Sequence, residues 1–139
     1  MADTVKTPVI AGNWKMHKGP ESARSFCREF VQVAPPASDR TVLLFPPALA
    51  VTAVREALGQ HDVGVGVQSI HWEAAGAFTG EISAPMAAEA GAGYALVGHS
   101  ERRHVFGETE EETGKKVAAA VAAGLVPVLC VGEKLEERK

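Results

Sequence analysis

The sequence has 139 residues, of which 46% are hydrophobic and 22% charged, and a formal net charge of −3 at pH 7, as is typical of one soluble globular domain. The chain has no excess of Lys and Arg to neutralise the phosphates of a nucleic acid, so we expect no nucleic-acid partner. It has no apolar run near the roughly 20 residues of a membrane-spanning helix and no signal-peptide pattern, so we expect a cytoplasmic protein without a membrane partner.

Short apolar runs alternate along the chain with helical patterns. Runs of this length are typical of buried parallel strands, and they occupy residues 9–11, 41–45, 63–67, 94–97 and 126–131. Apolar residues at spacings of three and four predict the first two helices, with one stripe formed by Phe26, Phe30 and Val33 and the other by Val51, Val54 and Leu58.

Two further helices are predicted from their ends. Ser83 can cap a short helix that tolerates Pro85 in its first turn and ends near Gly91. Thr109 and Glu112 have capping-box spacing at the start of the last helix. Two features support this last helix. Glu111 and Glu112 each precede a lysine, Lys115 and Lys116, by four residues, and Gly124 can end the helix.

Strand-helix alternation predicts an α/β fold with a parallel sheet. Five strands and four helices fit either an open doubly wound sheet or part of a (β/α)8 barrel, and periodicity does not separate the two. In both folds, ligands bind at the carboxyl ends of the strands, so residues that follow the apolar runs are the candidates for a site.

The first run leads into Gly12–Met16, which contains the only asparagine of the chain. Alternation along an extended segment would send Asn13 and Lys15 to the same side, where an amide and an ammonium could meet an anionic or carbonyl-bearing ligand. The alternative is that Lys15 is a solvated surface charge.

The fourth run leads into Gly98 and His99, followed by polar residues that open a new turn. A histidine at a helix N-terminus meets unpaired amides and the positive end of the dipole, which favour a neutral ring able to donate a hydrogen bond to a substrate oxygen. A packed histidine with satisfied nitrogens is the alternative. Glu101 could accept from a substrate hydroxyl or from Lys15, or join an ion-pair network, which we favour for Arg102 and Glu108.

Other segments carry weaker signals. Residues 76–81 place an aromatic residue and a threonine between glycines, which suits either a protruding sticky loop or a surface turn. The remaining histidines lack zinc spacing, and no nucleotide-binding or serine-hydrolase motif is present, so we expect no metal and no such cofactor. Cys27 and Cys130 are expected to be reduced, packed thiols.

Four motifs in order, residues 12–16, 76–81, 97–103 and 126–133, resemble the triosephosphate isomerase family over essentially the whole chain. The resemblance implies a dimeric (β/α)8 barrel that interconverts dihydroxyacetone phosphate and glyceraldehyde 3-phosphate by proton transfer, without a cofactor. It also implies a histidine held neutral by a helix N-terminus, which is a known feature of this family.

The resemblance implies a role for each matching residue. His99 and Lys15 would be catalytic, and Asn13 and Lys15 would bind the substrate. Ser100 and Glu101 would support this site, and Arg102 and Glu108 would form a structural ion pair. The dimer interface would include Phe78, Thr79, Gly80 and Glu81.

The fold typically needs about 250 residues and eight strands. We therefore expect residues 1–139 to be the N-terminal part of a single barrel domain, with the glutamate base, the lid and the phosphate-binding turns outside it. An alternative is a catalytically inactive, self-associating half-barrel, meaning an unclosed part of the barrel with two exposed sheet edges.

Overall fold

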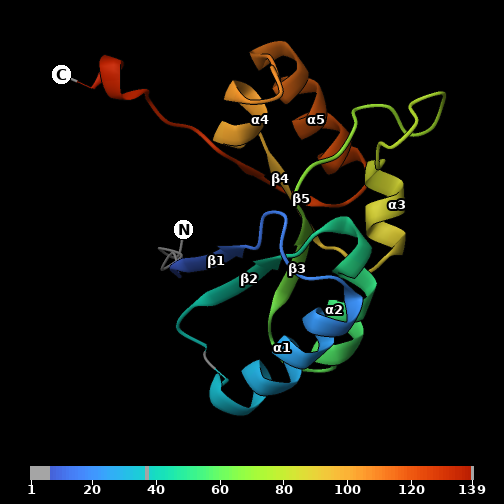
Figure 1. Ribbon diagram of the computed structural model, residues 1–139, viewed down its shortest axis with the longest axis vertical. Helices are drawn as coiled ribbons and strands as arrows, with labels where there is room; N and C mark the ends of the chain where they lie inside the picture. Colours follow the sequence, from blue (N-terminus) through green and yellow to red (C-terminus); the bar gives the residue numbers. More distant parts are fainter. Residues whose placement is uncertain (1–6, 37, 139) are drawn as a thin grey trace, which may run out of the picture.

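The structure is a computed structural model that describes residues 7–36 and 38–138. Five strands form one parallel sheet in the order of the chain (Figure 1). They are β1 (Val9–Asn13), β2 (Thr41–Phe45), β3 (Gly64–Val67), β4 (Tyr94–Val97) and β5 (Val126–Leu129). The predicted α/β fold, with helices between parallel strands as in part of a (β/α)8 barrel, is confirmed.

The helices and 3-10 turns lie between and after the strands. They are α1 (Pro20–Val33), η1 (Ala48–Ala50), α2 (Val51–Leu58), α3 (Ala84–Glu89), α4 (Ser100–His104), α5 (Glu110–Ala122) and η2 (Leu135–Glu137). The four predicted helices did not include α4, because five residues are too few to show a 3.6-residue period, but the helix N-terminus expected at His99 is the start of α4. Among the described residues, no helix is long and apolar enough to cross a membrane.

The predicted helix starts agree with the structure. The Ser83 hydroxyl accepts a hydrogen bond from the Met86 amide at 3.2 Å. At α5 the Thr109 hydroxyl accepts from the Glu112 amide at 3.1 Å, while the Glu112 carboxylate accepts from the Thr109 amide at 3.0 Å. The pairing of Glu112 with Lys116 four residues later was wrong, because Glu112 completes this capping box and Lys116 is buried elsewhere.

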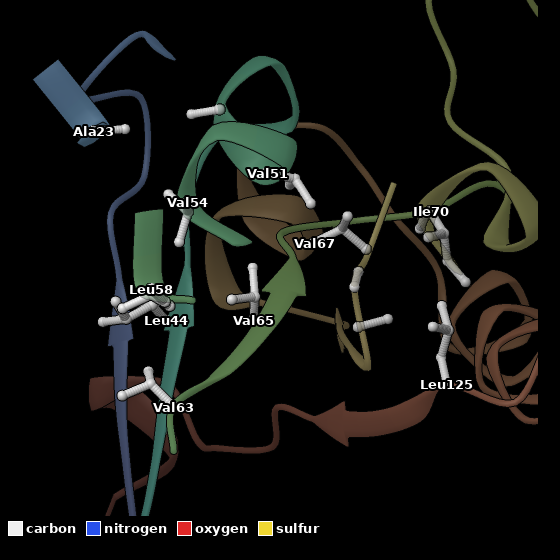
Figure 2. Packing of buried hydrophobic residues seen from close by; sticks show 14 of the residues in the cluster. Ala23, Leu44, Val51, Val54, Leu58, Val63, Val65, Val67, Ile70 and Leu125 are labelled. Atoms are coloured by element: carbon white, nitrogen blue, oxygen red, sulfur yellow. The ribbon is translucent and has the colours of Figure 1, made fainter. Parts of the chain in front are cut away.

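The main hydrophobic core lies between the sheet and the helices that cover its outer face. Figure 2 shows Val65 and Val67 of β3 pointing toward Val51 and Val54 of α2. Val33 was expected on the apolar stripe of α1 but is 78% exposed, because it is the last residue of that helix. The opposite face of the sheet holds a smaller cluster of Leu43, Phe45 and Leu96.

Burial differs between inner and edge strands. The strands β2, β3 and β4 have neighbours on both sides, and most of their side chains are buried. The expectation that the first and last runs are buried was wrong, since Val9 of β1 is 60% exposed and Val126 of β5 is 52% exposed. Both strands lie at edges of the sheet, where one side has no strand in the described part of the chain.

The sheet places the candidate residues at one end of the molecule. Parallel strands all have their carboxyl ends at the same edge, so the segment after β1 and the segment after β4 emerge together. In Figure 1 the long loop between β3 and α3 extends away from the sheet, and the chain after β5 runs away to η2.

Candidate functional site

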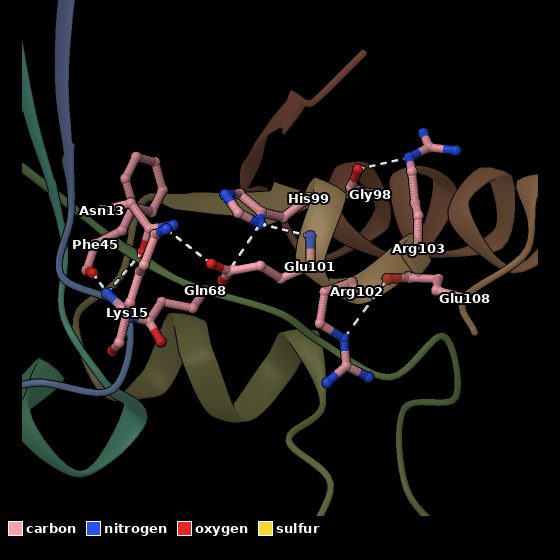
Figure 3. Close-up of polar contacts among 10 residues, drawn as sticks. All are labelled: Asn13, Lys15, Phe45, Gln68, Gly98, His99, Glu101, Arg102, Arg103 and Glu108. Carbon is pink, nitrogen blue, oxygen red and sulfur yellow. Dashed lines mark hydrogen bonds and ion pairs between the residues drawn. The ribbon is translucent and has the colours of Figure 1, made fainter. Parts of the chain in front are cut away.

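A cavity of about 540 Å³ lies at the carboxyl ends of the strands. It brings together Asn13 and Lys15 from the end of β1 with His99 and Glu101 from the end of β4 (Figure 3). Its other lining residues are Met16, His17, Gln68, Ser69, Arg102, Val105 and Phe106. Two segments that are 84 residues apart, counted from Lys15 to His99, therefore form one site.

The backbone at Lys15 adopts a conformation that is unusual for a residue with a side chain. Its φ is +53°, in the left-handed region, which costs on the order of 1 kcal/mol and persists only where neighbours hold it. The Asn13 Oδ1 atom accepts from the Lys15 amide at 2.9 Å, and Gln68 Nε2 donates to the Lys15 carbonyl at 2.8 Å. The side chains of Asn13 and Lys15 thus both reach the cavity, as expected. Strand alternation is not the reason, because β1 ends at Asn13 and Lys15 lies beyond it.

The Lys15 ammonium and the Glu101 carboxylate form the ion pair at the centre of this site. Lys15 Nζ lies 2.7 Å from Glu101 Oε1. The hydrogen bond from Lys15 holds the pKa of the Glu101 carboxyl below its ordinary value. Three partners were weighed for Glu101, namely a substrate hydroxyl, Lys15 and an ion-pair network, and in the structure Glu101 pairs with Lys15.

His99 is the N-cap residue of α4, and its ring is fixed by that helix. The Glu101 amide donates to His99 Nδ1 at 3.1 Å. The Glu101 Oε2 atom is 3.7 Å from the same nitrogen, which is beyond hydrogen-bond distance. The hydrogen-bond partner of Nδ1 is therefore the Glu101 amide and not its carboxylate. In this contact Nδ1 is the acceptor, which leaves Nε2 as the ring nitrogen that can donate to a ligand.

Gln68 is a structural residue of the site that the sequence reasoning missed. Its Nε2 atom donates to the Phe45 carbonyl at 2.9 Å as well as to the Lys15 carbonyl, so it joins the ends of β1 and β2. Gln68 directly follows the third apolar run. The rule that selected Asn13 and His99, a polar residue soon after an apolar run, would have found it.

Ser100 does not line this cavity. It lies on the other side of His99, in a second cavity of about 340 Å³ that also contains Arg103, Cys130 and Gly132. A supporting role for Ser100 would therefore act through the start of α4 and not through contact with a ligand in the first cavity.

The predicted pair of Arg102 and Glu108 lies in a buried cluster with a third charge. Arg102 Nε is 3.7 Å from Glu108 Oε2, while Lys116 Nζ is only 2.8 Å from Glu108 Oε1. Lys116 also donates to Ser69 Oγ, on the cavity wall, at 3.2 Å. The side chains of Glu108 and Lys116 are 3% and 5% exposed. The sequence spacing paired Lys116 with Glu112, and its local sequence carries no sign of this burial.

The loop expected at a subunit interface projects from the rest of the fold. Phe78, Thr79, Gly80 and Glu81 are exposed and do not line the cavity. The ring of Phe78 stacks on that of His71 with centroids 4.1 Å apart, which orders the loop.

Neither metal nor thiol chemistry is suggested by the described residues. They contain no group of three or more His, Cys, Asp or Glu side chains that could hold a metal ion. Both cysteines are free, and burial raises the pKa of the Cys27 and Cys130 thiols, which makes them poor nucleophiles.

Comparisons with known proteins agree with the resemblance seen in the motifs. The family model for triosephosphate isomerase matches residues 8–139. The triosephosphate isomerase of Synechococcus sp. (strain RCC307) is 47% identical over 139 residues, which cover 99% of this chain and 55% of that protein. The enzyme of the same name from Carboxydothermus hydrogenoformans (strain ATCC BAA-161 / DSM 6008 / Z-2901) is 46% identical over 135 residues, covering 97% of this chain and 54% of the relative.

A solved structure shows the same fold. The crystal structure of triosephosphate isomerase from Bartonella henselae matches with a TM-score of 0.87 and 40% sequence identity, over 96% of this chain and 55% of that one. The chain thus spans about half the length of the curated relatives it matches.

Proposed function

The chain belongs to the triosephosphate isomerase family, and on that premise we propose that the protein interconverts dihydroxyacetone phosphate and D-glyceraldehyde 3-phosphate. The observation that carries this proposal is the convergence of Lys15 and His99 on one cavity at the carboxyl ends of β1 and β4, with His99 Nδ1 accepting from the Glu101 amide. Residues 1–139 would form the N-terminal part of a single (β/α)8 barrel domain.

Lys15 and His99 would stabilise the charge that builds on oxygen during the reaction. The isomerisation moves a proton from one carbon to the next through an enediolate, whose oxygens carry negative charge. The Lys15 ammonium would attract both this charge and the substrate phosphate. His99 Nε2–H would donate to the carbonyl and hydroxyl oxygens, since its Nδ1 is occupied by the Glu101 amide.

Asn13 would bind the substrate through its side-chain nitrogen. Its oxygen is used by the Lys15 amide at 2.9 Å, which turns the amide into a fixed donor toward the cavity. Glu101 would support the site by holding Lys15 and His99, and Ser100 would support it from the start of α4.

The base that removes the carbon-bound proton would come from the part of the family's length that this chain does not span. Glu101 lines the cavity, but it is engaged by Lys15 at 2.7 Å and its pKa is lowered, which makes it a weak base. The remaining steps need no metal or organic cofactor, because they only move protons between carbon, oxygen and the base.

Kinetics of the complete protein test the proposal. A coupled assay should show turnover of both triose phosphates, and His99→Gln should lower kcat by about 100-fold or more, which is typical for loss of one preorganised donor. His104→Gln is the matched control, since His104 is exposed on the same helix and does not line the cavity. Absence of triose phosphate turnover in the unaltered protein would refute the function, and an active His99→Gln variant would refute the role of His99.

We propose, again from family membership, that the protein is a cytoplasmic homodimer whose loop 76–81 contacts the second copy. The exposed loop tip and the ordered Phe78 ring, which is 42% exposed, support this contact. Phe78→Asp should shift the complete protein toward monomer in sedimentation velocity, whereas Ala75→Asp, outside the family motif, should not. A Phe78→Asp variant that remains as dimeric as the unaltered protein would argue against it.

A further inference from the structure

The guanidinium of Arg103 lies between the ends of β4 and β5. Its Nε donates to the Gly98 carbonyl at 2.6 Å (Figure 3). Its Nη2 donates to the Cys130 carbonyl at 3.1 Å. A third nitrogen, Nη1, pairs with Glu110. The Arg103 side chain is 16% exposed, while that of Glu110 is 86% exposed, so the two carbonyls are the shielded partners.

Both carbonyls lie just past the point where the strand ladder stops. The last ladder pair is Val97 with Leu129, and the Cys130 amide still donates to the Val97 carbonyl at 2.9 Å. Beyond this bond the carbonyls of Gly98 and Cys130 have no partner on the neighbouring strand. Arg103 supplies both donors, as the planar fork of an arginine allows.

The backbone at Gly98 is shaped around this guanidinium. Gly98 has a φ of +70°, and a Cβ added there would lie 2.6 Å from Arg103 Nη2. The Gly98–His99 peptide is therefore fixed on one side by Arg103, while the His99 ring is fixed on the other by the Glu101 amide.

We propose that Arg103 is a positioning residue for His99. By holding the Gly98 carbonyl against the end of β5, it sets the direction in which His99 leaves β4 and hence the place of Nε2 in the cavity. The Glu110 ion pair is a side contact that this role does not need. The inference rests on the proposed function for its kinetic consequence, but its geometric content stands apart from that function.

Kinetics of the complete protein separate the carbonyl contacts from the ion pair. Arg103→Lys keeps the charge but offers one point in place of a fork, and should lower kcat by about 10-fold to 100-fold with KM within about twofold, because a displacement of a reacting group costs rate more than binding. Glu110→Gln removes only the charge of the exposed partner, and should leave both constants within about twofold. An Arg103→Lys variant with unchanged kcat, or a Glu110→Gln variant that loses as much, would overturn the proposal.

A second measurement needs neither a variant nor turnover. In the unaltered complete protein, the Arg103 Nε–H should appear in ¹⁵N NMR spectra with hydrogen exchange at least 10-fold slower than that of the exposed Arg24. Exchange as fast as that of Arg24 would overturn the clamp on Gly98. If the protein lacks triose phosphate turnover but Arg103 Nε–H is protected, the proposed function fails and the hold of Arg103 on the Gly98 carbonyl stands. A shift of the His99 ring signals in Arg103→Lys, measured separately, then shows that this hold positions His99.

Discussion

The Lys15 ammonium lies 2.7 Å from the Glu101 carboxylate, so the cation expected to meet an anionic substrate already has an anionic neighbour. The two side chains are 53% and 45% exposed, and an ion pair that faces water to this degree is weak and screened by salt. An anionic ligand can therefore compete for Lys15 without first breaking a strong contact.

The Lys15–Glu101 pair should make stability depend on pH in acid. The folded-state pKa of Glu101 is lowered, so the pair stabilises the fold above the ordinary pKa near 4.5 and loses that effect as pH falls through the lower folded-state value. The difference in free energy of unfolding between the unaltered protein and Glu101→Gln should therefore shrink below about pH 4.5. Urea denaturation from pH 7 to pH 3 measures it, and a difference that stays constant over this range would contradict the lowered pKa.

Two glycines should respond in opposite ways to alanine. Gly98→Ala places a Cβ 2.6 Å from Arg103 Nη2 and 2.9 Å from Thr113 Cγ2 at a φ of +70°, and should destabilise the fold by about 1–3 kcal/mol. Gly114 lies within α5 with nothing within 4 Å of an added Cβ, so Gly114→Ala should stabilise the fold by roughly 0.5–1 kcal/mol. Thermal unfolding of both variants checks the signs, and equal effects would contradict the steric conflict at Gly98.

Gln68 should tolerate loss of its amide better than replacement by a carboxylate. Gln68→Leu removes donors to the Lys15 and Phe45 carbonyls and should lower the free energy of unfolding by about 1–2 kcal/mol. Gln68→Glu sets a negative charge against the same carbonyls at pH 7, and should be the more destabilised variant until the carboxyl is protonated near its ordinary pKa of about 4.3.

The measurement for Gln68 is the stability of each variant relative to the unaltered protein at pH 7 and at pH 4. Gln60→Leu, at an exposed position, should stay within about 0.5 kcal/mol at both values. A Gln68→Glu variant whose deficit is the same at the two pH values would argue against the two carbonyl contacts.

The sequence was informative about the strands because each is a short, continuous apolar run. It overestimated burial in β1 and β5, since the exposure of Val9 and Val126 depends on which neighbours a strand has in the sheet and not on its own residues. It indicated a helix start at His99 but not the extent of α4, because five residues carry no readable period.

The candidate site was predictable where polar residues stand at the carboxyl end of a strand, as Asn13 and His99 do. The contacts of Gln68 and Arg103 could not be read from the chain, because both side chains bind main-chain carbonyls of distant residues, and a carbonyl is present at every position. Lys116 was misread for a related reason, since its partner Glu108 lies in the loop before α5 and not on the helix.

The buried pair of Lys116 and Glu108 should behave differently from an exposed pair on the same helix. Lys116→Met leaves Glu108 buried with Arg102 at 3.7 Å as its remaining cation, and should destabilise the fold by about 3–5 kcal/mol. Lys115→Met breaks the exposed pair with Glu111, which has a separation of 3.2 Å, and should change stability by at most about 1 kcal/mol.

A double variant decides whether the loss in Lys116→Met comes from the stranded carboxylate. If it does, Lys116→Met combined with Glu108→Leu should be more stable than Lys116→Met alone, because the second change removes the uncompensated buried charge. Chemical denaturation of the single and double variants measures this coupling. Strictly additive losses would instead mean that each side chain contributes through its own packing, and that the short contact between Lys116 and Glu108 does not stabilise the cluster.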